Sequence, residues 1–291
     1  MPIRRRRTVR LALVALLLSA GPLLAQDDTV TIGLRPTPGQ SQRLRTTQTL
    51  VMTVIPEGTP PPGFPAEGLN LEQETVTVMR QDVGLVDEKG RVRHDMTYES
   101  MTQTSRLNGK ELPLPGGRAD VFDGKTLTLW IDAAGEIADV GLPEGFPLAA
   151  DQVRAMLAPM VSAVPRQPLK IGQSVTKPFS MNLPVPAGGA PPTITATTKT
   201  TLRAIEGVGT DRVAAFDIAV NGTLAAEPGG AGPQMTMSID GAGSMRQHIA
   251  SGLMVEQSSD QTIDGHFTLP VPGAPRMTMK GRVHVVSAKV E

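Results

Sequence analysis

The sequence has 291 residues, no cysteine, and only one Trp and one Tyr. Basic and acidic residues balance at 28 each, but five arginines and no acid fall in residues 1–25, so the rest of the chain carries 23 basic against 28 acidic residues, a formal charge of −5. A mildly acidic chain with few aromatic rings excludes nucleic acid as its main partner, because phosphates need a positive surface and bases need stacking platforms. The lack of cysteine excludes disulfides, thiol catalysis and thiolate metal sites.

Residues 1–25 have the order of a secretory signal peptide. Arginines at positions 4–7 and 10 precede an apolar run at 11–18, and Ala25 stands just before a polar stretch. The apolar run is about half the roughly 20 residues that a membrane-spanning helix needs. The sequence therefore predicts export to the periplasm or beyond, from a Gram-negative bacterium, with no stable membrane span after cleavage. A retained N-terminal anchor is the alternative.

The rest of the chain, residues 26–291, alternates apolar and polar residues with a period of two. The pattern runs through TLVMTVI (49–55), 74–86, TLTLWI (126–131), 193–205 and 276–286. Such alternation is typical of strands with one buried and one wet face, and the Gly-containing turns between the runs favour antiparallel hairpins. The pattern predicts a single, mainly β domain of about twelve long antiparallel strands that form an open or half barrel.

One segment, residues 148–164, has the spacing of an amphipathic helix. Its apolar residues recur every three or four positions, and Asp151 stands in its first turn, where acids are favoured. Because this apolar stripe needs a surface to cover it, we expect the helix to lie against the concave face of the sheet. The helix also divides the chain into two strand-rich halves, 26–147 and 165–291, in which 133–135 aligns with 250–252. This weak similarity suggests an internal repeat.

The segment after the helix carries a resemblance to a known group. PRQPLKIGQSV, within residues 164–179, resembles a run found in uncharacterised exported bacterial β-rich proteins, although Val175 stands where those proteins have an aromatic residue. That group is similar in fold to the lipoprotein carriers, which are half-open barrels that shelter acyl chains. The resemblance implies a fold and, by analogy, a cavity for an apolar ligand.

No arrangement of residues predicts catalysis or a resident metal. The acids around Trp130 are spaced four and three apart, which does not match a calcium loop, and the stretch is better explained as a β-hairpin with a charged rim. The four histidines, at positions 94, 248, 266 and 284, form no zinc-ligand pattern. Nucleophile and phosphate-loop motifs are also lacking. We therefore expect a non-enzymatic protein without cofactor.

Methionine is the remaining chemical feature, with 14 residues, several of which alternate along strands. Three explanations stay open: core filling, a pliable wall for an apolar ligand, and Cu(I) binding through thioethers. The ligand-wall hypothesis predicts a cavity between helix and sheet, lined by Val153, Met156, Leu157, Met160, Met235, Met237, Met277 and Met279. The predicted function is binding of a lipid or other apolar molecule. The alternative is a structural or interaction module of the cell envelope with a filled core, and Cu(I) binding ranks third.

Overall fold

The structure is a computed structural model that describes residues 29–32, 38–60, 63–112, 122–146, 148–162, 164–182, 192–226, 234–268 and 274–290. The predicted signal peptide, residues 1–25, lies outside this part of the chain. Of residues 159, 160, 162 and 182 only the backbone is described.

Most of the described chain forms one antiparallel sheet of twelve strands. The first half supplies β2 (Ser41–Pro56), β3 (Leu69–Val86), β4 (Val92–Leu107), β5 (Lys110–Glu111), β6 (Thr126–Ile131) and β7 (Ile137–Gly141). The second half supplies β9 (Ser174–Asn182), β10 (Thr193–Glu206), β11 (Val213–Ala226), β12 (Gln234–His248), β13 (Met254–Thr268) and β14 (Arg276–Val290). Between the halves lies α1 (Ala150–Ser162). The short strands β1 (Thr29–Val30) and β8 (Leu169–Lys170) form a separate pair, and a 3-10 turn spans Gly209–Asp211.

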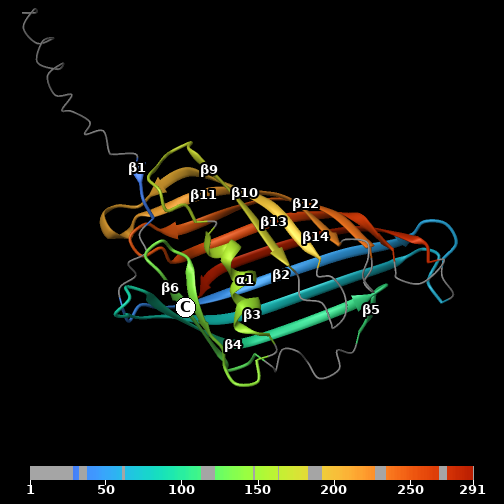
Figure 1. Ribbon diagram of the computed structural model, residues 1–291, viewed down its shortest axis with the longest axis horizontal. Helices are drawn as coiled ribbons and strands as arrows, with labels where there is room; N and C mark the ends of the chain where they lie inside the picture. Colours follow the sequence, from blue (N-terminus) through green and yellow to red (C-terminus); the bar gives the residue numbers. More distant parts are fainter. Residues whose placement is uncertain are drawn as a thin grey trace, which may run out of the picture.

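The sheet is not closed into a barrel. Its order is β7-β6-β4-β3-β2-β14-β13-β12-β11-β10-β9, with β5 attached to β4, so each half is a meander and the two join where β2 pairs with β14. Figure 1 shows the strands side by side in one curved sheet, with α1 in front of it between β9 and β6. The predicted open or half barrel with one helix against its concave side is confirmed. The internal repeat stays a prediction.

The hairpin of β6 and β7 shows how the local sequence makes these elements. Asp132 directly follows β6, and its Oδ1 accepts hydrogen bonds from the backbone N–H groups of Ala134 and Glu136, both at 2.9 Å. The carboxylate therefore closes the turn, as Asp does in Asx turns. Along β6 the residues alternate between buried and half-buried, so Leu127 and Leu129 face the core while Trp130 lies on the threonine side, as the period of two predicts.

The two ends of the sheet differ. We call the end of the sheet that carries the short turns 87–91, 207–212 and 249–253 the turn end. Two groups of side chains pack on the inner face there. Val30 and Ile32, with Val164 and Leu169, pack on buried inner-facing residues of three strands, Leu202, Phe216 and Met245. Leu253, directly before β13, packs on Val83 of β3 and Val92 of β4, although β2 and β14 lie between β3 and β13 in the sheet. The sheet is thus curled strongly enough at this end to bring distant strands together.

Glycines on the inner face explain part of the curvature. At Gly265 of β13 an added Cβ would lie 2.3 Å from the carbonyl oxygen of Thr236, and at Gly243 of β12 it would lie 2.3 Å from that of Ser258. Neither residue has a positive φ, so the requirement comes from the close approach of the neighbouring strand. A side chain at either point would hold the strands apart and flatten the sheet.

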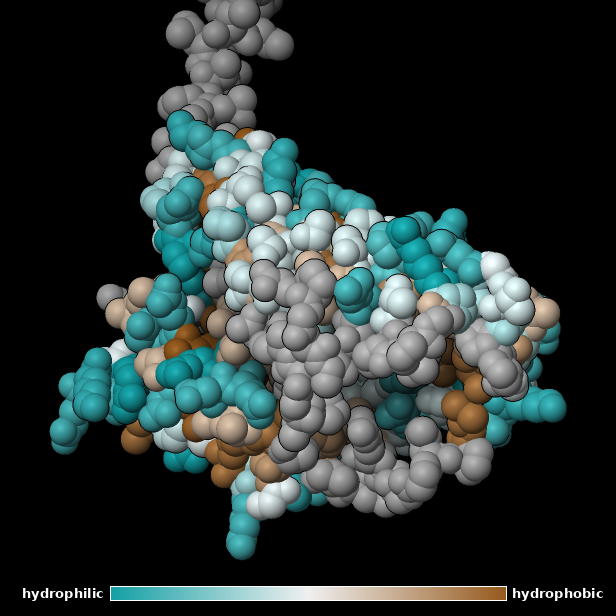
Figure 2. Space-filling model, turned by 45° about the vertical axis from the view of Figure 1, so that its right-hand side comes forward, coloured by the Kyte–Doolittle hydropathy of each residue, from teal (hydrophilic) through white to brown (hydrophobic). Residues whose placement is uncertain are grey.

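The outer face is mostly polar, although Val51, Ile55 and Val286 are exposed on it. Its exposed residues include the ion pairs Arg43–Glu99 at 2.8 Å and Arg80–Asp82 at 2.8 Å. On the side of the molecule that Figure 2 shows, the coloured surface is mainly hydrophilic and hydrophobic residues form separate patches. The alternation along the strands therefore sorts charge outward and apolar groups inward, and a binding site for an apolar molecule has to be sought inside.

Candidate functional site

The middle of the inner face is lined by aliphatic side chains that are only half-buried. Residues paired directly across antiparallel strands face the same side, so the row Val220, Gly241, Gln261, Val283, Leu50 and Gln73 crosses six strands on the inner face. The aliphatic side chains of this region share an intermediate exposure: Leu50, Ile218, Val220, Ile239, Ile263, Val283 and Val285. Inward-facing aliphatic groups that keep contact with solvent form a surface on which an apolar ligand could lie.

Polar side chains are interspersed among these aliphatic groups. Thr198 and Thr200 of β10 and Ser105 of β4 are buried on the inner face, and Gln261 is half-buried there. Hydroxyl and amide groups of this kind orient a ligand's polar atoms while the aliphatic groups supply contact area. The inner face is therefore mixed rather than uniformly apolar.

Four methionines gather at the opposite end of the sheet, which we call the methionine end. Met237 and Met279 are buried in one cluster with Leu224, and Met235 packs against that cluster. Met277, with 2% of its surface exposed, pairs with Phe267, which also packs there. The strand methionines of the predicted ligand wall thus share one face and one end of the sheet.

The helix is anchored at the turn end. Val153 is buried among Leu127, Leu129, Ile137 and Val140 of the β6–β7 hairpin, and Leu157 and Val161 pack on the same cluster. Met156, the next apolar residue, is 43% exposed and faces away. The side chain of Met160 lies outside the described residues. The helix therefore covers the edge of the sheet formed by β6 and β7.

A groove of about 560 Å³ separates the other side of α1 from the opposite sheet edge. It is lined by Asp151, Arg154, Ala155 and Ala158 of α1, by Glu136 and Ile137 beside β7, and by Phe179 and Ser180 of β9. We call it the helix groove. Phe179 also pairs with Ala196 and so belongs to the inner face, which places the groove beside that face. Its volume falls in the range of small-molecule sites.

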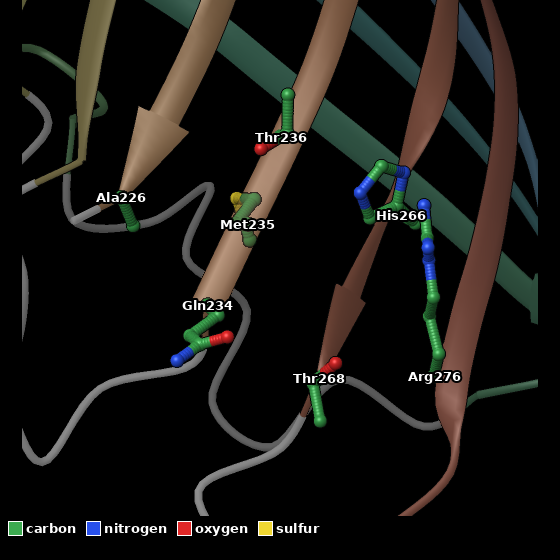
Figure 3. A pocket seen from close by; sticks show the side chains of 7 residues that line it. All are labelled: Ala226, Gln234, Met235, Thr236, His266, Thr268 and Arg276. Atoms are coloured by element: carbon green, nitrogen blue, oxygen red, sulfur yellow. The ribbon is translucent and has the colours of Figure 1, made fainter. Parts of the chain in front are cut away.

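A second, smaller pocket of about 320 Å³ lies at the methionine end, where β11 to β14 begin or end. Figure 3 shows its lining, in which the side chain of Arg276 extends toward the ring of His266. Met235 is the only residue of the predicted wall among those that line it. Arg276 is balanced by Glu57, whose carboxylate lies 3.7 Å away. This pocket is polar and sits at the rim, so it offers little to an apolar chain.

A buried polar network crosses the inner face at the turn end. Gln42 of β2 donates to Oε1 of Gln81 at 2.9 Å, and Gln81 in turn contacts Nδ1 of His94 at 3.1 Å. Burial holds the pKa of the His94 imidazole below its ordinary value; the carboxylate of Asp95 opposes this shift, and the charge of Arg166 adds to it. His94 is therefore kept neutral, and Arg166 lies close enough to act on it.

The structure separates the predicted wall into two groups. Val153 and Leu157 lie on the β6–β7 hairpin at the turn end, and the strand methionines lie at the other end, so these two groups do not face one another. The role of these residues as a ligand wall stays a prediction. Sequence reasoning missed Phe179, because Pro178 obscures the strand pattern of β9, and it missed Arg166, for which the sequence gives no signal.

Two negative findings apply to the described ranges. Within them no group of three or more His, Asp or Glu residues is placed to hold a metal ion. In the same part of the chain the helix is too short and too polar to cross a membrane.

The class of protein that the fold defines is an open antiparallel half barrel with one helix at its opening. No protein-family model matches the sequence, and no curated protein sequence matches it. A solved structure of lipovitellin, described in terms of lipid–protein interactions, is similar over 88% of this chain, with 11% sequence identity and a TM-score of 0.45. The chain spans 25% of the length of that protein.

A second solved structure, an outer-membrane channel from Pseudomonas putida F1, aligns with 86% of this chain and 96% of its own. The identity is 9% and the TM-score 0.18. Both likenesses are too distant to transfer a function, so the proposal below rests on this chain's own residues.

Proposed function

We propose that this chain is an exported, non-enzymatic protein that binds a lipid or another apolar molecule between its sheet and α1. The observation that carries the proposal is the half-buried aliphatic middle of the inner face, which faces inward and yet keeps contact with solvent. The helix groove supports it, because Phe179 belongs both to the lining of the groove and to that face. The resemblance of residues 164–179 to exported carrier-like proteins is consistent with export and with the binding of an apolar molecule.

The energetics favour a long ligand. Covering apolar surface contributes about 2.5 kcal/mol per 100 Å², whereas association costs roughly 4–15 kcal/mol in lost freedom. A small apolar molecule on this mixed surface therefore gains too little. An extended acyl chain covers several hundred Å² of itself and the wall together, and it can reach from the turn end toward the methionine end. The proposed ligand class is thus an acyl-chain lipid.

The groove gives the proposal a direct test. Ala158 is exposed on α1 and lines the helix groove, so Ala158→Trp fills the groove without disturbing the packed face of the helix. Ala242→Trp, on the exposed outer face of β12, is the matched control. We expect delipidated protein to take up a fluorescent fatty acid, with at least tenfold weaker binding in Ala158→Trp and unchanged binding in the control.

Native mass spectrometry of protein purified gently from its own envelope completes the test. The proposal expects a co-purified lipid and a mass that lacks residues 1–25. A ligand-free spectrum together with no uptake by the delipidated protein would overturn lipid binding and favour the alternative, a structural or interaction module of the cell envelope.

A further inference from the structure

Arg166 occupies an unusual place in this fold. It lies in the segment between α1 and β8, which the buried residues Val164, Pro165 and Leu169 hold against the inner face at the turn end. Pro165, directly before Arg166, is buried, whereas Gln167 and Pro168 after it are exposed. The charge of Arg166 contributes to the lowered pKa of His94, so its guanidinium lies near the buried network of the inner face.

The guanidinium lacks the partners that a buried cation needs. Nε and Nη1 of Arg166 are buried and have no hydrogen-bond partner, and within the described residues Arg166 makes no ion pair. Arg246 shows the contrast, since its buried Nε belongs to a guanidinium that pairs with Glu206 at 2.7 Å and Glu256 at 3.5 Å. Burial lowers the pKa of Arg166 to about 10, which still leaves it charged at neutral pH.

The surroundings of Arg166 add polar groups that carry no charge. His94, on which the charge of Arg166 acts, is kept neutral, and its Nδ1 is occupied by Gln81. The carboxylate of Asp95 is engaged elsewhere, by Arg93 at 3.0 Å and by Thr128 at 2.7 Å. A desolvated cation beside neutral hydrogen-bonding groups is complementary to an oxyanion, and a guanidinium binds carboxylates and phosphates especially well.

We propose that Arg166 binds the anionic head, a carboxylate or phosphate, of an amphiphile whose acyl chain lies along the inner face. The inference rests on the proposed function and narrows its ligand class from apolar molecules in general to anionic lipids. The residue remains half-buried rather than fully enclosed, so a head group can reach it. From Phe216, which packs in one cluster with Val164 and Leu169 of the same segment, β11 runs eight residues to Leu224 at the methionine end, roughly 26 Å at about 3.3 Å per residue. The half-buried aliphatic residues Ile218 and Val220 of the inner face lie along that path.

The test compares two probes that share one chain. Delipidated full-length mature protein is titrated with cis-parinaric acid, which carries a carboxylate, and with its methyl ester, which does not. We expect the acid to bind more tightly than the ester in the native protein. Arg166→Gln lowers affinity for the acid by roughly 10- to 100-fold, as for loss of a hydrogen bond between charged groups, and leaves the ester unchanged. Arg166→Lys keeps part of the preference for the acid over the ester. Arg203→Gln, a substitution on the outer face, keeps all of this preference.

Inorganic phosphate at millimolar concentration forms a further arm. It distinguishes a lipid head from a free anion, and we expect it to displace the acid only weakly. Equal affinity for acid and ester in the native protein overturns the inference and leaves the proposed function intact. Equal loss of both probes in Arg166→Gln assigns the residue to packing and also overturns it. Full displacement of the acid by phosphate would show that the site binds a free anion rather than a lipid head, and it would also overturn the inference. Binding of neither probe refutes the proposed function itself.

Discussion

The close approach of β12 and β13 at Gly265 gives a sharp prediction for the curved sheet. Gly265→Ala would place a Cβ at 2.3 Å from the carbonyl oxygen of Thr236 and at 2.6 Å from the Cα of Met237, both backbone atoms that cannot rotate away. Gly281 of the adjacent strand β14 provides the matched control. It also faces inward, but a Cβ there would meet its nearest neighbour, the carbonyl oxygen of Val51, at 3.5 Å, an ordinary contact.

The two substitutions should change stability in opposite directions. Overpacking a tight site costs about 1–3 kcal/mol, whereas replacing a strand glycine by alanine in a site with room stabilises by about 0.5–1 kcal/mol. The two effects oppose each other in Gly265→Ala, so we expect a net destabilisation of about 1–2 kcal/mol. Gly281→Ala should be more stable than the native protein by up to about 1 kcal/mol. The variants then differ by about 2 kcal/mol, or roughly 4–8 °C in Tm for a domain of this size.

Thermal and urea unfolding measure this difference, with circular dichroism for the sheet and the fluorescence of Trp130, the only tryptophan, as a second probe. Equal stability of the two alanine variants would show that the strands do not approach closely at Gly265. The explanation of the curvature by inward-facing glycines would then be wrong.

The β6–β7 hairpin and the buried histidine can each be tested by substitution. Asp132→Ala removes the acceptor of two backbone N–H groups and should destabilise the hairpin by about 1–2 kcal/mol, seen as faster hydrogen exchange at Ala134 and Glu136, while Asp132→Asn keeps most of the protection. The pKa of His94 is depressed in the folded state, so the unfolded state binds more protons as the pH falls below 6.5, and the His94 contribution to stability is lost in that direction. The urea midpoint should therefore fall between pH 7.5 and 5.5 by more in the native protein than in His94→Gln, and parallel profiles would contradict this.

The fold could be predicted because its signal is local. In TLTLWI every second residue is aliphatic, and the structure buries Leu127 and Leu129 while it leaves Trp130 on the outer face. The predicted helix, 148–164, matches α1, Ala150–Ser162, within two residues at each end. Asp132 and Gly135 mark a turn by their chemistry, without reference to the rest of the chain.

The candidate site was less predictable because it depends on position along the strands. An alternation with a period of two predicts which face of the sheet a side chain lies on, but not how far along the strand, and so at which end of the sheet, it lies. The sequence pattern predicts that Met237 and Val153 both face inward and line one ligand wall. The structure places them in separate clusters at opposite ends of the sheet. Arg166 gave no signal, because its importance comes from partners it lacks, and only packing reveals that. Inward-facing glycines such as Gly265 look like interruptions of a strand until the neighbouring strand is placed.

The position of α1 has a consequence for association between molecules. The strands at the two ends of the sheet order, β7 and β9, are separated by a helix that contacts both of them. A helix is about 10 Å across, or roughly two strand spacings, so these strands cannot pair with each other. The half barrel is therefore held open by the diameter of the helix, and its edge strands are not joined by hydrogen bonds. An edge strand is also a template for another chain, and the helix packs on one of the two edges, that of β7. A chain in which α1 is detached would leave this edge open to pairing with a strand of another molecule.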